Sequence, residues 1–159
     1  MSVPEHPPGA LRTGNIADEL ARGQVDLHVT VVSPTAQIYA GAAHWVKAPG
    51  VDGLFGIWPR HVALVAALGG GILTIGLPGN QRLEFAVGGG FLEVSSNTVT
   101  VLVDHAVTEA EAPAHTAEAQ AELEEVIAEL HHPSSDAEFE ELQERRSWSQ
   151  ARLKLAGRK

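Results

Sequence analysis

The sequence contains no cysteine, few aromatic residues and no long apolar segment. Without cysteine the chain can form neither a disulfide framework nor a thiolate metal site. No stretch approaches the roughly 20 apolar residues of a transmembrane helix, so we expect no direct insertion into a membrane. The N-terminus also lacks the basic and then apolar order of a secretory signal, which favours the cytoplasm.

Basic residues are scarce as well. The chain has 11 lysines and arginines against 20 aspartates and glutamates, which gives a net charge of −9. Such an acidic chain is a poor ligand for nucleic acid or for an anionic membrane surface, and we expect neither as a partner. The charge is unevenly spread: residues 1–107 hold eight acidic and five basic residues, whereas residues 108–159 hold twelve and six. Within the second part every acidic residue lies at or before Glu144 and every basic residue at or after Arg145. This change in composition predicts a domain boundary near Val107.

What the sequence does contain, between residues 25 and 107, is a series of short apolar segments separated by Gly, Pro and Asn turns. Some alternate with a period of two, which is typical of strands with one buried face: Val25, Leu27, Val29 and Val31. Residues 62–68 are apolar on both faces. We interpret Gly69-Gly70-Gly71 and Gly88-Gly89-Gly90 as turns. About eight short strands without a helical crossover predict a mostly antiparallel β-sandwich or flattened barrel.

From residue 113 the apolar period becomes helical. Two narrow stripes are expected, the first of Ala119, Leu123, Ile127 and Leu130 and the second of Phe139, Leu142, Leu153 and Ala156. Ser135 and Glu138 have the spacing of a capping box, in which Ser135 is the N-cap and Glu138 reaches back to it. The pattern predicts an antiparallel helical hairpin that buries little area and can detach from the β-domain.

The residue types that carry chemistry do not gather into an active-site pattern. His28, His44 and His105 are isolated residues in or beside predicted strands, and His131-His132 lies at a helix end, where a cation suits the helix dipole. Asp104 and His105 are neighbours in a predicted strand, so their side chains are expected to point to opposite faces. Neither glycine triplet is followed by a helix or by the Lys-Ser/Thr of a phosphate loop. We therefore expect no catalytic residue, no metal site and no cofactor.

Residues 48–61 form the most distinctive stretch, because they combine three glycines and two prolines with four large apolar residues, Leu54, Phe55, Ile57 and Trp58. A surface loop would ordinarily be polar. Two interpretations stay open at this point: a loop that packs on its own core, and an apolar loop that a partner covers.

Two ordered signatures relate the chain to a known family. The first, Pro-Gly-x-x-Gly-x-x-Gly-Ile-x-Pro-x-His, is present as Pro49-Gly50, Gly53, Gly56-Ile57, Pro59 and His61. The second is Phe85-Ala86-Val87-Gly88-Gly89-Gly90-Phe91-Leu92-Glu93-Val94. With these motifs, residues 24–159 resemble the epsilon subunit of bacterial-type F-type ATP synthases, which is the delta subunit in mitochondria.

The resemblance implies a β-sandwich of about ten strands in residues 24–107 and a helical hairpin in residues 108–159, after a mobile extension of residues 1–23. It also implies a non-catalytic rotor subunit in the central stalk of F1, which links the gamma subunit to the c-ring. The residues implied at the gamma and c-ring interface are Leu54, Phe55, Gly56, Ile57, Trp58, Pro59, Arg60 and His61.

The resemblance further implies that the hairpin can extend into the alpha/beta catalytic hexamer and obstruct ATP hydrolysis. The basic residues implied for this role are Arg145, Arg146, Arg152 and Lys154. The complex would lie peripherally at the cytoplasmic face of the bacterial inner membrane. A free-standing β-sandwich interaction module and a small hydrolase are the alternatives.

The chain departs from the family pattern in three ways. Leu54 replaces a carboxylate that often contacts the ring, and Arg60 replaces a glycine and supplies a possible substitute charge. Some relatives bind ATP through an arginine-containing motif in the first C-terminal helix. Residues 113–130 contain no Arg or Lys, so we predict no nucleotide site here.

Overall fold

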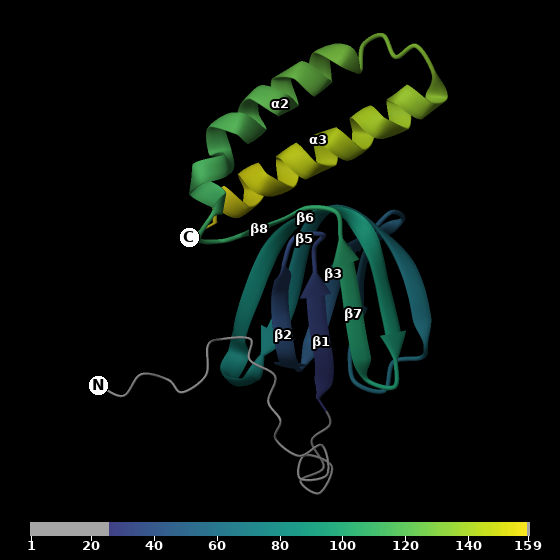
Figure 1. Ribbon diagram of the computed structural model, residues 1–159, viewed down its shortest axis with the longest axis vertical. Coiled ribbons are helices and arrows are strands. Elements are labelled where there is room, and N and C mark those ends of the chain that lie inside the picture. Colours follow the sequence, from purple (N-terminus) through teal and green to yellow (C-terminus); the bar gives the residue numbers. More distant parts are fainter. Residues whose placement is uncertain (1–25, 159) are drawn as a thin grey trace, which may run out of the picture.

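The computed structural model describes residues 26–158, so the predicted extension of residues 1–23 lies outside the described residues. Residues 26–158 form eight strands followed by two α-helices (Figure 1). The strands are β1 (Leu27–Val32), β2 (Gln37–Ala43), β3 (Trp45–Gly50), β4 (Gly53–Ile57), β5 (Leu64–Leu77), β6 (Gln81–Ser95), β7 (Thr98–Val103) and β8 (Ala106–Thr108). The helices are α2 (Thr116–Glu129) and α3 (Asp136–Ala156), and two short 3-10 turns are η1 (Pro78–Asn80) and η2 (Ala112–His115).

The described strands follow the order β2-β1-β7-β6-β5-β3-β4, and β8 pairs with β6. Every pairing is antiparallel except that of β1 with β7. The sheet encloses one core, in which the largest fully buried side chains include Leu27, Ile57, Leu73, Ile75 and Leu92. The alternation in β1 buries Leu27, Val29 and Val31, as predicted. This confirms the predicted β-sandwich followed by a two-helix unit.

The interpretation of the two glycine triplets as turns is wrong. Both triplets lie inside long strands, the first in β5 and the second in β6, and Gly70 pairs with Gly88 across the ladder. Both strands arch over the end of the sandwich that carries the helices (Figure 1). Because glycine has no Cβ and tolerates positive φ, as at Gly90 with φ +132°, it permits this bend without ending the strand.

The hairpin is stacked on the sandwich, with α3 between the sheet and α2 (Figure 1). A small second cluster joins α3 to the sheet and to η2, and its buried members are Ile72, Ala86, Val107, Ala112, Ala151 and Leu155. The predicted apolar stripes are only partly correct. In α2, Val126 is buried and Ile127 is exposed; in α3, Leu142 is buried and Phe139 is exposed. Ser149 and Arg152 take buried positions in α3 instead.

The start of α3 is capped nearly as predicted. The Ser135 hydroxyl accepts a hydrogen bond from the Glu138 backbone N–H at 3.1 Å. The Glu138 carboxylate reaches back to Ser134, not to Ser135, and accepts from the Ser134 backbone N–H at 2.5 Å and from its hydroxyl. The side-chain and backbone hydrogen bonds from Ser134 lower the pKa of the Glu138 carboxyl.

The division of the chain near Val107 into two units stays a prediction. The position lies within β8, which pairs with β6, and the next described elements are η2 and α2. The connection is closed by a reciprocal pair of hydrogen bonds between Thr108 and Glu111.

Candidate interaction site

The stretch at residues 48–61 forms a strand hairpin and a turn, not a single loop. β3 and β4 pair in antiparallel register from Val46 opposite Ile57 to Gly50 opposite Gly53, where the chain reverses. Gly53 has φ +130°, a conformation that L side chains rarely adopt, which accounts for the motif glycine at this position.

The apolar residues of β4, and Trp58 directly after it, divide between the two sides of the hairpin. Ile57 is fully buried and Phe55 packs against the core, whereas the side chain of Leu54 is 65% exposed and that of Trp58 is 59% exposed. Packing on the core, the first interpretation of this stretch, therefore applies to Phe55 and Ile57. Exposure to a partner, the second interpretation, applies to Leu54 and Trp58. Ile57 can support an interface only from beneath, because it offers no surface to a partner.

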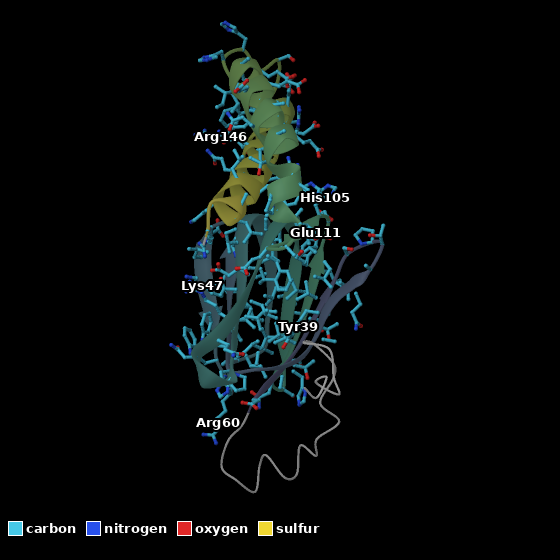
Figure 2. The ribbon with its side chains drawn as sticks, turned by 90° about the vertical axis from the view of Figure 1, so that its left-hand side faces the viewer. Tyr39, Lys47, Arg60, His105, Glu111 and Arg146 are labelled. Atoms are coloured by element: carbon cyan, nitrogen blue, oxygen red, sulfur yellow. The ribbon has the colours of Figure 1, made fainter. Side chains whose placement is uncertain are left out.

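The exposed residues of the stretch lie at separate places. Leu54 borders a groove beside α3, which Ser147, Gln150 and Lys154 also line. Trp58 lies four residues further along, about 13 Å at the rise of a strand. Arg60 is located at the end of the molecule farthest from the hairpin (Figure 2).

The turn after β4 fixes the remaining motif residues. The exposed Arg60 has φ +66°, so the position that the family usually gives to glycine is in the left-handed region. The His61 backbone N–H donates to the Trp58 carbonyl at 3.2 Å. The His61 Nδ1 lies 2.8 Å from the Val62 carbonyl, which can only accept a hydrogen bond, so Nδ1 is the protonated nitrogen in this contact.

A second apolar surface was not identified from the sequence. Phe91 of β6 lies opposite both Ala67 of β5 and Leu102 of β7, and Val65 lies two residues from Ala67 on the same side of β5. The side chains of Val65, Phe91 and Leu102 are more than half exposed, as is that of Val62 just before β5. The sequence does carry a signal for this surface: residues 62–68 are apolar on both faces of the strand, although the sandwich buries only one face.

The four basic residues of α3 do not share one surface. Arg145 lies 3.7 Å from Glu122, 3.7 Å from Glu125 and 3.3 Å from Glu129, all on α2. Arg152 is only 3% exposed and pairs with Glu118 at 3.8 Å and closely with Glu122.

The other two basic residues lie elsewhere on α3. The Arg146 Nε is buried without a hydrogen-bond partner among residues 26–158, and Lys154 is exposed beside the Leu54 groove. The docked hairpin therefore neutralises two of the four basic side chains internally.

A cavity of about 910 Å³ opens between the hairpin and the sandwich. Its lining holds two arginines, Arg145 and Arg152, against six carboxylates, Asp104, Glu118, Glu122, Glu125, Glu141 and Glu144. Both arginines are already paired with glutamates of α2. The cavity therefore offers a polyphosphate more repulsion than attraction.

Across residues 26–158, no three side chains of the kinds that bind metals come together as a possible metal site. Neither α2 nor α3 is both long and apolar enough to cross a membrane.

The fold and its surfaces define a class: a β-sandwich that carries a docked helical hairpin and exposes large apolar side chains. The family model described as "ATP synthase, Delta/Epsilon chain, beta-sandwich domain" matches residues 26–109. The chain belongs to this ATP synthase delta/epsilon family. It is accordingly a stalk subunit of the F1 sector, a complex peripheral to the membrane, and not a catalytic subunit.

Individual relatives agree with this assignment. The chain is 44% identical over 104 residues to the ATP synthase epsilon chain of Laribacter hongkongensis, a match that covers 62% of this chain and 74% of the relative. It is 38% identical over 116 residues to the epsilon chain of Neisseria meningitidis, covering 66% and 83% respectively. Among solved structures, a chain of the Euglena gracilis mitochondrial ATP synthase assembly of OSCP, F1 and c-ring shares the fold, with TM-score 0.60 and 18% identity over 92% of this chain and 87% of that chain.

Proposed function

We propose that this chain fastens the gamma subunit of ATP synthase to the c-ring and that its C-terminal hairpin restrains ATP hydrolysis by the alpha/beta hexamer. The observation that carries the proposal is the separation of two kinds of surface. Exposed apolar side chains gather on the sandwich, whereas the helical hairpin with its basic residues is stacked on one end (Figure 1).

The outer face of β5, β6 and β7 supports a permanent protein contact. Val62, Val65, Phe91 and Leu102 are all more than half exposed, and three of them lie on neighbouring strands. An apolar group of this kind is stabilised when a partner removes it from water, at about 25 cal/mol per Å² of apolar surface. We assign this face to the gamma subunit, which in the family packs on the sandwich.

The β4 segment supports contacts with more than one partner. Leu54 and Trp58 are both exposed and lie about 13 Å apart along the chain direction. Leu54 stands where the family often has a carboxylate, so that charge is missing here. Arg60 supplies an exposed positive charge beyond Trp58 instead. We propose that residues 54–61, apart from the buried Ile57, are covered jointly by gamma and the c-ring.

Aspartate substitutions test this assignment. Leu54→Asp and Trp58→Asp would each bury an unpaired charge at an interface, at a cost of several kcal/mol. Each variant should weaken either gamma binding or proton-coupled ATP synthesis in reconstituted vesicles, and the pattern of losses identifies the partner at each position. Normal gamma binding together with normal coupling in both variants would reject the proposed contacts.

The hairpin supports a regulatory role because its contact with the sandwich is small. The buried cluster between α3 and the sheet has only six members, of which three are alanines and the others are Ile72, Val107 and Leu155. A docked and an extended state separated by a small free energy can then be biased by partners. In the extended state Arg145, Arg146, Arg152 and Lys154 would face acidic residues of the beta subunit.

Truncation tests the regulatory role. A chain that ends at residue 110 keeps every strand and should still bind gamma, and the assembled complex should hydrolyse ATP faster. Unchanged hydrolysis would remove the inhibitory role while leaving the proposed stalk contacts in place.

The proposed location is the cytoplasmic face of the inner membrane, since the relatives from Laribacter and Neisseria are bacterial.

A further inference from the structure

Trp148 of α3 stands on a floor made of two glycines. Gly70 of β5 and Gly88 of β6 pair with each other directly beneath this part of the helix. A Cβ at Gly88 would lie 2.9 Å from the Trp148 ring, and one at Gly70 would lie 2.7 Å from the backbone of Ser147 and Trp148. Carbon atoms do not approach so closely, so α3 can dock at this depth only because both positions lack a side chain.

Two further side chains contact the Trp148 indole. The His105 ring, which comes from the connection between β7 and β8, is stacked on the indole with its centroid 5.6 Å away and an interplanar angle of 26°. The Arg152 guanidinium lies 4.7 Å from the indole centroid. Stacking and cation–π contacts of this kind add to the stabilisation that burial of the large ring provides.

Arg152 extends the same group of contacts to the other helix. It is buried, pairs with Glu118 and Glu122 of α2, and its Nη2 lies 3.4 Å from the Ser149 hydroxyl. A buried guanidinium whose carboxylate partner is removed leaves an uncompensated charge, so these contacts hold α2 against α3.

We propose that Gly70, Gly88, His105 and Trp148 form a latch that holds the hairpin in the docked state on the sheet. Trp148 is the largest side chain in the contact between α3 and the sheet, where the other members are mostly alanines. When Trp148 leaves the glycine floor, α3 loses its stacking contact with His105, and the hairpin is free to move away from the sheet. The regulatory consequence rests on the proposed function.

The latch is tested on the full chain by amide hydrogen exchange. Trp148→Ala removes the ring, and Gly70→Ala places a methyl group against the helix backbone. The matched control is Gly69→Ala, where the nearest atom would lie at an ordinary 3.8 Å. We expect amides of α3 to exchange at least tenfold faster in the first two variants and at the wild-type rate in the control, with the β6 and β7 amides unchanged.

Wild-type protection of α3 in Trp148→Ala would overturn the latch, whatever Gly70→Ala does to the sheet. The complex then separates the two proposals. If the hairpin is released, the assembled Trp148→Ala enzyme should hydrolyse ATP more slowly than wild type, by a factor of two or more. Released α3 with unchanged hydrolysis would confirm the latch and reject the inhibitory role.

Discussion

The Arg60 backbone N–H donates a hydrogen bond to the Asn97 side-chain oxygen at 2.6 Å, and both residues have positive φ, +66° and +61°. Ser96 also has positive φ, so the connection between β6 and β7 has the form of a type I′ hairpin turn that asparagine suits. The turn after β4 and the turn after β6 are thus joined at the end of the sandwich that lies away from the helices.

Arg60→Gly should stabilise the chain. A side chain in the left-handed region costs about 1–2 kcal/mol, and glycine removes that cost, although it also gives the unfolded chain more freedom. We expect a net gain of about 0.5–1 kcal/mol by urea unfolding. Asn97→Ala should lose about 1–2 kcal/mol, because it removes the hydrogen bond to Arg60 and places alanine at positive φ. A loss of stability in Arg60→Gly would show that the arginine side chain compensates for its backbone.

Of two adjacent residues of β6, only one should destabilise the chain when its side chain is replaced by alanine. Leu92 is fully buried in the core and Phe91 is exposed. Leu92→Ala should destabilise the chain by about 2–5 kcal/mol, whereas Phe91→Ala should change its stability by less than about 0.5 kcal/mol. Thermal unfolding of the isolated chain measures both. Equal losses would mean that Phe91 is packed against its own domain.

The junction between the sandwich and the hairpin should depend on pH. Hydrogen bonds from the Thr108 backbone, and next from its side chain, lower the pKa of the Glu111 carboxyl. The folded pKa lies below the unfolded one, so this stabilisation is present above the ordinary glutamate pKa and is lost as the pH falls through the folded pKa. Glu111 is largely exposed, so its contribution is small, about 0.5 kcal/mol.

Glu111→Gln should therefore lower the melting temperature at pH 7 and have no effect at about pH 2, where both pKa values have been passed. Glu109→Gln, two residues away, serves as the control because its side chain makes no hydrogen bond among residues 26–158. An equal effect of Glu111→Gln at both pH values would show that the carboxylate charge is irrelevant to the junction.

The chain should not bind ATP. The cavity between the hairpin and the sandwich presents five glutamates against two arginines that are already paired, and residues 113–130 supply no Arg or Lys. Isothermal titration of the full chain with ATP, with and without Mg²⁺, should give no binding heat at 1 mM ligand. A dissociation constant below about 0.1 mM would contradict this prediction.

The amino-acid pattern predicts the sandwich well because strand alternation is a local property. Leu27, Val29 and Val31 point inward as their period of two requires. The glycine triplets could not be interpreted in the same way, since the composition of a turn and that of a bent strand are alike. What distinguishes them is the presence of α3 above Gly70 and Gly88, and α3 is far away in the sequence.

The candidate site was predictable only in part for a similar reason. The motif located residues 54–61, but alternation along β4 and into Trp58 directly after it decides that Ile57 is buried while Leu54 and Trp58 are exposed. The pairing of Arg152 with Glu122 joins residues 30 positions apart, and it depends on how the two helices meet. The helical period of apolar residues predicted which apolar side chains of α3 face inward. It could not predict that Ser149 and Arg152 are buried, because polar residues are buried only where they find a partner.

The most direct measurement is the affinity of the gamma subunit for Phe91→Asp, compared with wild type and with Ile127→Asp, which places the same charge on an exposed apolar position of α2. An unpaired charge introduced at the centre of an apolar interface weakens binding by about 2 kcal/mol or more, which raises the dissociation constant at least 30-fold. We predict this loss for Phe91→Asp and less than a threefold change for Ile127→Asp. Undiminished binding of gamma by a folded Phe91→Asp chain would contradict the proposed docking face.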